Sequence, residues 1–220
     1  MNKKPQGYDL MMKFYDCSTA PSPRRARMVL AEKRIEVETI EVDLRSGEQF
    51  SDSFTAINPR CTVPVLVSED GETFCDNASI ARYLEAEYPD PPIMGRGAVE
   101  QARVAEWIWR AEFEGLVSVM EVLRNTSRAM KDRALPGPDK VAQIPELAER
   151  GRARGQKFFK TLDARLGEAP WLGGDAFSFA DITAFVFVEF AAWVKMAPDE
   201  ALTNLAKWRE SCAARPSGKV

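Results

Sequence analysis

The chain has 220 residues, of which 45% are hydrophobic and 29% are charged, and its formal net charge is -3. This composition predicts a globular protein with a substantial core, long enough for one large or two modest domains. Acids and bases are intermixed, so the charge pattern indicates neither nucleic acid nor a membrane as a partner. The sequence contains no histidine, which excludes Ser-His-Asp and Cys-His catalysis and imidazole metal sites.

The sequence shows no signal peptide or membrane span. Its start, MNKKPQGYDL, lacks an apolar run, and no later stretch approaches about 18 uninterrupted apolar residues. We therefore expect a cytoplasmic protein. The four cysteines (Cys17, Cys61, Cys75 and Cys212) show neither a Cys-x-x-Cys motif nor zinc-site spacing, so we expect reduced thiols and no bound metal.

In residues 11–89 the spacing of apolar residues switches over short stretches between that of a strand and that of a helix, as in an α/β domain. Residues 1–10 are an N-terminal extension before it. Met12 to Cys17 is a short apolar run typical of a strand. Ser22-Pro23 then supplies a preferred N-cap followed by proline at the first helical position, and helical spacing continues to Lys33. Alternating side chains over 35–44 predict a second strand and complete a β-α-β unit.

A hairpin and a helix follow in the same half. Asp70-Gly71 separates two short apolar runs at 64–67 and 73–75, which is a strong signal for a hairpin turn. Helical spacing then resumes at 78–88 and stops at Pro89. The order β-α-β followed by β-β-α predicts a thioredoxin-like domain.

The second half has a different pattern. Prolines and Asp90 make residues 90–97 a suitable linker, and strand signals then nearly vanish. We predict helices at 98–128, 145–166, 178–194 and 200–214. Ser178 and Asp181 form a capping-box pattern at the start of the third helix. The predicted fold class is therefore an α/β thioredoxin-like N-terminal domain plus an all-α C-terminal domain at 98–220.

With this organisation in hand, several stretches resemble the cytosolic, bacterial-type glutathione S-transferase family, and together they span nearly the whole chain from Lys13 to Lys219. They are APSPRRARMVLAEKRIEVE, NPRCTVPVL, CDNASIARYLEAEYP, FSFADITAF and WRESCAARPS. The resemblance implies a homodimeric enzyme with glutathione as co-substrate and a hydrophobic small-molecule electrophile as the second substrate. The two-fold interface would join the α/β half of one subunit to the helical half of the other.

The resemblance also implies the glutathione contacts. In the family, a cis-proline, here Pro64, turns the N–H and C=O of Val63 toward glutathione like one rung of a β-ladder, next to Thr62. Asp76 and Asn77 would hold the γ-glutamyl ammonium and carboxylate at a helix N-terminus, where the family more often has a glutamate-serine pair. The alternatives are a proline that only starts a strand and a plain helix cap.

Catalysis in this family requires the glutathione thiol to become a thiolate. A free thiol with a pKa of about 8.5 is roughly 3% ionised at pH 7, and one or two charge-assisted hydrogen bonds lower that pKa enough. Ser22, Thr19 and Ser18 are the candidate hydroxyl donors, because Ala20 stands where several relatives hold a serine or cysteine. We favour Ser22 as the residue that begins the helix; alternatively it is only a cap. Cys17 has no resolving partner in the sequence.

Trp107 and Trp109 cannot share one face of a helix, because residues two apart lie about 200° around it. One should pack inside, and the other should face the substrate cleft or a partner subunit. We expect Trp109 and Phe113 to contact the hydrophobic substrate.

Three functions remain open from the sequence. The first is conjugation of the glutathione thiolate to hydrophobic electrophiles, a detoxification reaction. The second is thiol-disulfide or dehalogenation chemistry on the same scaffold, against which the missing Cys-x-x-Cys and Ala20 count. The third is a non-catalytic interaction protein with the same fold, because fold does not fix function.

Overall fold

The computed structural model describes residues 11–220, so the expected extension at 1–10 lies outside the described residues. The first half forms a four-stranded sheet in the spatial order β2-β1-β3-β4. Its strands are β1 (Lys13–Asp16), β2 (Glu38–Glu41), β3 (Val65–Val67) and β4 (Thr73–Phe74). β1 pairs parallel with β2 and antiparallel with β3, which pairs antiparallel with β4.

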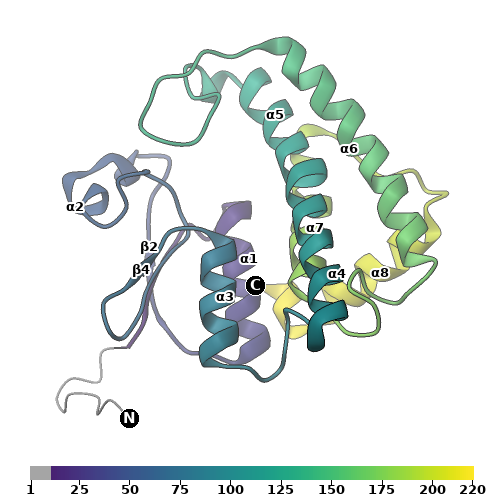
Figure 1. Cartoon of the computed structure of the whole chain (residues 1–220). Coiled ribbons are helices and arrows are strands. Elements are labelled where there is room, and N and C mark those ends of the chain that lie inside the picture. The colour runs from purple at the N-terminus through teal and green to yellow at the C-terminus, as the bar shows by residue number, and fades with distance from the viewer. Residues whose placement is uncertain (1–10) are drawn as a thin grey trace, which may run out of the picture.

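Helices α1 (Pro21–Lys33) and α3 (Asn77–Glu87) lie side by side between the sheet and the helical half (Figure 1). A short helix, α2 (Asp52–Thr55), follows β2. Gly71 has a φ of +86° in the turn between β3 and β4, which is a conformation that glycine adopts at no steric cost. The predicted hairpin at Asp70-Gly71 and the thioredoxin-like fold class are thereby confirmed.

The predicted start of the first helix is wrong. The helix begins at Pro21, and its N-cap residue is Ala20, whose side chain makes no capping bond. Ser22 is therefore the second residue inside the helix and not its cap. The reason is that proline is tolerated anywhere in the first turn, whose N–H groups have no intrahelical acceptor, so Pro21 and Pro23 fit the sequence pattern equally well.

The second half is helical. Its elements are α4 (Gly97–Arg110), a π-helical turn η2 (Ala111–Leu116), α5 (Val117–Thr126), α6 (Pro145–Leu166), α7 (Phe179–Ala191) and α8 (Thr203–Ala214). α4, η2 and α5 follow one another without a break and account for the long predicted helix at 98–128. The π-helical turn within it was not expected from the sequence.

The core centres on α7, in which nearly every residue is buried. The predicted capping box is confirmed, with Ser178 and Asp181 bonded reciprocally. Asp181 also accepts hydrogen bonds from the Leu172 N–H at 3.0 Å and the Trp208 indole at 3.0 Å. This buried carboxylate therefore fixes the start of α7 against the loop before it and against α8. Among the helices of residues 11–220, none combines the length and apolar character needed to cross a membrane.

Candidate functional site

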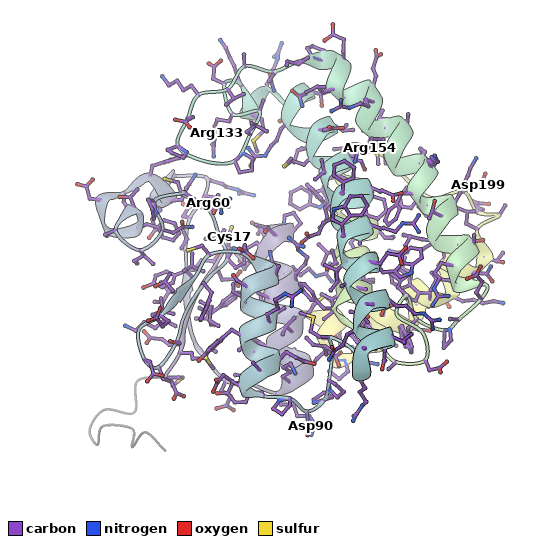
Figure 2. The ribbon with its side chains drawn as sticks, viewed as in Figure 1. Cys17, Arg60, Asp90, Arg133, Arg154 and Asp199 are labelled. Atoms are coloured by element: carbon purple, nitrogen blue, oxygen red, sulfur yellow. The ribbon has the colours of Figure 1, made fainter. Side chains whose placement is uncertain are left out.

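Three segments meet at one end of the sheet. They are the loop between β1 and α1, the segment before β3, and the N-terminus of α3. Cys17 and Val63 pack in one buried cluster, with Ala20 and Cys75 against its edge. Figure 2 shows Cys17 where the ends of α1 and α3 meet this cluster. Thus the sequence-predicted residues from 18 to 22, 62 to 64 and 76 to 77 are brought together.

The peptide bond between Val63 and Pro64 is cis, as the resemblance implied. Val63 is buried, and no described residue forms a hydrogen bond with its N–H or C=O. Since buried main-chain polar groups are nearly always paired, these two groups are suited to an extended peptide ligand.

Asn58 holds the segment beside Val63 and was missed by the sequence reasoning. Its buried side-chain amide donates to the main-chain O of Thr62 at 2.7 Å and to the Thr62 hydroxyl at 3.1 Å. Its own oxygen accepts from the Arg60 N–H at 3.0 Å. The only sequence signal was its place shortly before the cis-proline.

Asp76 is the N-cap of α3, and its Oδ1 accepts the Ser79 N–H at 2.8 Å. Asn77, the next residue, is 4% exposed and donates from Nδ2 to the Ser22 hydroxyl oxygen at 3.1 Å. The Oδ1 of Asn77 is buried and has no hydrogen-bond partner among the described residues. A buried polar atom without a partner is costly, and a bound ligand with an N–H donor at this helix end would satisfy it.

The three candidate hydroxyls have different partners. Ser18 donates from its hydroxyl to the Glu41 carboxylate at 3.0 Å, and its N–H donates to the same oxygen at 2.8 Å. The Thr19 hydroxyl lies 3.6 Å from the Cys17 sulfur. The Ser22 oxygen accepts from Asn77, so its own proton remains available. Ser18 is thus bonded to a carboxylate, whereas no acceptor among residues 11–220 takes the Ser22 proton.

Arg25 links this end of the molecule to the helical half. Its guanidinium is buried and donates to Glu112 at 2.5 Å, and Glu112 lies in the π-helical turn η2. Burial lowers the pKa of Arg25, and the Glu112 and Asp76 carboxylates oppose that shift. The ion pair therefore joins α1 to η2 beside the N-terminus of α3.

A cavity of about 300 Å³ lies between the start of α1 and the end of α7. It is lined by the loop before α1, the first turns of α1 and the last turns of α7. Trp193, just after α7, and Val220 complete the lining. The lining residues are Ser18, Thr19, Ala20, Pro21, Arg24, Arg27, Val186, Glu189, Phe190, Trp193 and Val220. The aromatic lining from Phe190 and Trp193 was missed, because their spacing alone is that of a core helix.

Trp109 and Phe113 lie elsewhere. Trp107 is 7% exposed and Trp109 is 58% exposed, so one packs inside and the other faces outward, as expected. Trp109 stacks on Phe113 at 5.1 Å and lines a groove between α3 and α4 together with Arg82. The Arg154 guanidinium covers the Phe113 ring at 4.6 Å. Neither of the two predicted substrate contacts lines the cavity beside Thr19.

The loop between α5 and α6 reaches across to the first half. The Arg133 guanidinium lies 5.5 Å from the centre of the Phe50 ring, and Gly137 lies close to the main-chain O of Arg60. Figure 2 shows Arg133 and Arg60 on these facing segments. The two halves are therefore bridged near the cis-proline as well as through Arg25.

The cysteines and other potential ligands add little chemistry. All four cysteines are unpaired, and burial raises the pKa of the Cys75 thiol, which opposes thiolate formation there. Within residues 11–220, no group of three or more histidine, cysteine, aspartate or glutamate side chains is arranged to hold a metal ion.

Comparison with known proteins gives a consistent result. The family model described as "Glutathione S-transferase, N-terminal domain" matches residues 19–87, and "Glutathione S-transferase, C-terminal domain" matches residues 124–216. Glutathione S-transferase 2 of Saccharomyces cerevisiae is 32% identical over 94% of this chain and 88% of its own. Disulfide-bond oxidoreductase YfcG of Escherichia coli is 27% identical over 92% of this chain and 91% of its own.

A solved structure agrees with these sequence relatives. The glutathione S-transferase domain-containing protein of Marinobacter aquaeolei superposes with a TM-score of 0.86 at 32% identity. The match covers 93% of this chain and 98% of that one.

The buried ion pair at the site generates a stability prediction. Glu112→Gln leaves the Arg25 guanidinium buried without its carboxylate, so we expect the free energy of unfolding to fall by about 2 to 3 kcal/mol in urea denaturation. Glu114→Gln is the matched control, because the arginine that it leaves unpaired, Arg110, is 26% exposed against 11% for Arg25, so the loss should be smaller, about 0.5 to 1 kcal/mol. Equal losses in the two variants would contradict the linking role of Arg25.

Proposed function

Because the chain belongs to the glutathione S-transferase family, we propose that it conjugates the glutathione thiolate to hydrophobic electrophiles. The observation that carries the proposal is the set of unsatisfied groups at one end of the sheet: the N–H and C=O of Val63 and the Oδ1 of Asn77. They fit an extended peptide whose α-amino and α-carboxylate groups lie at the N-terminus of α3. A cytoplasmic location and a role in detoxification are part of the same proposal.

In the proposed complex, Val63 pairs by its main chain with the cysteinyl part of glutathione, beside Thr62 and Pro64. Asp76 binds the γ-glutamyl ammonium with its free oxygen, while the main-chain N–H groups at the start of α3 bind the carboxylate. Asn77 receives an N–H donor at its Oδ1. The sulfur then lies near the start of α1, where the helix dipole favours an anion.

Ser22 is the proposed donor to the sulfur. Asn77 donates to the Ser22 oxygen at 3.1 Å, which leaves the Ser22 proton for the thiolate and polarises the hydroxyl in that direction. Thr19, which lines the adjacent cavity, is the second candidate, and Ser18 the third because Glu41 takes its proton.

Thiol-disulfide exchange is the alternative reaction on the same site. The similarity to a protein named disulfide-bond oxidoreductase favours it, and a hydroxyethyl disulfide assay distinguishes it from turnover of 1-chloro-2,4-dinitrobenzene. A non-catalytic interaction protein would turn over neither compound.

Glutathione binding should raise the melting temperature, because a ligand of the folded state adds about 2.7 kcal/mol at a hundredfold excess over Kd. Asp76→Asn keeps a side-chain oxygen for the Ser79 N–H but loses the charge, so it should reduce this shift without a large loss of intrinsic stability. Asp76→Ala should reduce the shift and also cost about 1 kcal/mol through loss of the cap. If both variants bind glutathione like the wild type, Asp76 does not contact the ligand.

Ser22→Ala should raise the pKa of bound glutathione by about one to two units, since one charge-assisted hydrogen bond is lost. Activity should fall about tenfold or more near pH 6.5 and recover as the pH rises, because the raised pKa leaves less thiolate at low pH. The ultraviolet absorbance of the bound thiolate measures this pKa directly. Intrinsic stability should fall by about 1 kcal/mol: Ser22 does not cap α1, but the buried Asn77 Nδ2 loses its acceptor.

Thr19→Val is the matched variant, since it keeps the shape of the side chain and removes the hydroxyl. A raised thiol pKa in Thr19→Val alone moves the role to Thr19. If neither variant changes the pKa, main-chain N–H groups at the start of α1 hold the sulfur.

We expect a homodimer through the exposed apolar side chains of α4 and η2. Val99, Trp109 and Phe113 are 67%, 58% and 49% exposed, and the groove beside Trp109 also includes α3. Such a patch on a water-soluble protein is typical of an interface. Sedimentation should give twice the 24.6 kDa chain mass, and Trp109→Glu should shift it toward the monomer. A monomeric wild type at micromolar concentration would refute the dimer.

A further inference from the structure

The cavity between the start of α1 and the end of α7 combines aromatic and cationic surfaces. Phe190 is 8% exposed and Trp193 is 58% exposed, and their rings meet edge to face at 5.4 Å. Arg24 lines the same cavity. A purely apolar substrate would contact the rings and make no use of the remaining N–H donors of the guanidinium.

Two other charged side chains in this wall already have partners. Arg27 donates to Asp16 at 2.6 Å and to two main-chain carbonyls of the neighbouring loop. Glu189 accepts from Arg209 at 2.7 Å. Their charges are therefore largely compensated by the protein.

Arg24 is different. Its Nε donates to the main-chain O of Val220 at 2.8 Å and its Nη2 to that of Gly218 at 3.0 Å. A guanidinium has five N–H donors, so three remain, and no aspartate or glutamate side chain of residues 11–220 forms an ion pair with it. Burial lowers the pKa of Arg24, while the Glu189 carboxylate of the same wall raises it. Arg24 is half-buried, and a charge-assisted hydrogen bond is stronger where water is partly excluded.

We propose that this cavity selects electrophiles that carry a carboxylate on an aromatic ring. Arg24 binds the carboxylate, and Phe190 and Trp193 pack against the ring. A volume of about 300 Å³ has room for one substituted ring. The inference rests on the proposed function, because Thr19 and Ala20 of the same wall lie at the loop where the thiolate is expected.

The probe is 4-chloro-3-nitrobenzoate, with 4-chloro-3-nitrobenzamide as its uncharged counterpart of similar shape. In the reaction, the thiolate sulfur forms a bond to the ring carbon that carries chlorine. The carbon–chlorine bond breaks and chloride leaves with the bonding electron pair. The thiol proton has passed to solvent before the attack.

Binding of both probes to the full chain is measured first, by calorimetry without glutathione. We expect the wild type to bind the acid about tenfold more tightly than the amide, and Arg24→Gln to lose this preference. Arg24→Lys should keep part of it, because lysine retains the charge but not the planar fork. Trp193→Ala should weaken binding of both probes.

Turnover is the second measurement. The acid-to-amide ratio of kcat/KM, with each value divided by the uncatalysed rate, should fall about tenfold in Arg24→Gln. Equal affinity of the wild type for acid and amide overturns the proposal, and so does a preference that survives in Arg24→Gln. If Trp193→Ala binds both probes as tightly as the wild type does, the proposed packing of Trp193 against the substrate ring is wrong. If Arg24→Gln does not fold, the proposal is tested by the acid-to-amide affinity ratios of the wild type and Arg24→Lys.

The binding measurement separates this inference from the proposed function. Failure to turn over 1-chloro-2,4-dinitrobenzene counts against conjugation, whereas the preference for the acid is measured without any reaction. A preference without turnover identifies an anion-selective binding site, and turnover without a preference leaves a transferase that does not use Arg24 for recognition.

Discussion

The ion pair between Arg25 and Glu112 is the contact on which the geometry of the candidate site depends. Arg25 lies on α1, which directly follows the loop that holds Ser18 and Thr19. Glu112 lies in the helical half. The Arg25 side chain is only 11% exposed, so its charge cannot return to water without moving α1, whereas the Glu112 side chain is 37% exposed. The ion pair therefore fixes the start of α1 relative to α4 and, through the nearby Asp76, to the start of α3.

The two helix starts converge as a result. Both N-termini carry the positive end of a helix dipole, and the bond between Ser22 and Asn77 joins them directly. The first turn of α1 has only the Ser22 N–H to offer, because Pro21 and Pro23 have none. The dipoles of both helices therefore favour an anion at this position. The proposed function relies on this arrangement to stabilise a thiolate, because the sequence has no histidine and residues 11–220 hold no metal-ligand cluster.

The sequence predicted the turn between β3 and β4 and the start of α7, because each depends only on residues that are close together in the chain. Asp70-Gly71 specifies its turn, and Ser178 with Asp181 specifies the start of α7, whatever the rest of the chain does. The start of α1 was missed because two prolines fit the same turn. The π-helical turn at Glu112 and the role of Asn58 depend on contacts between distant segments, which no periodicity encodes. The cavity lining from Phe190 and Trp193 was hidden for the same reason.

The bridge between Arg133 and Phe50 has a consequence for how ligands enter and leave. An exposed contact of this kind contributes only about 0.5 to 1 kcal/mol. Separating these two segments therefore costs far less than removing the buried Arg25 guanidinium from its carboxylate. In the proposed function, glutathione and product can pass this edge when two surface segments separate, while the Arg25 pair keeps α1 against η2.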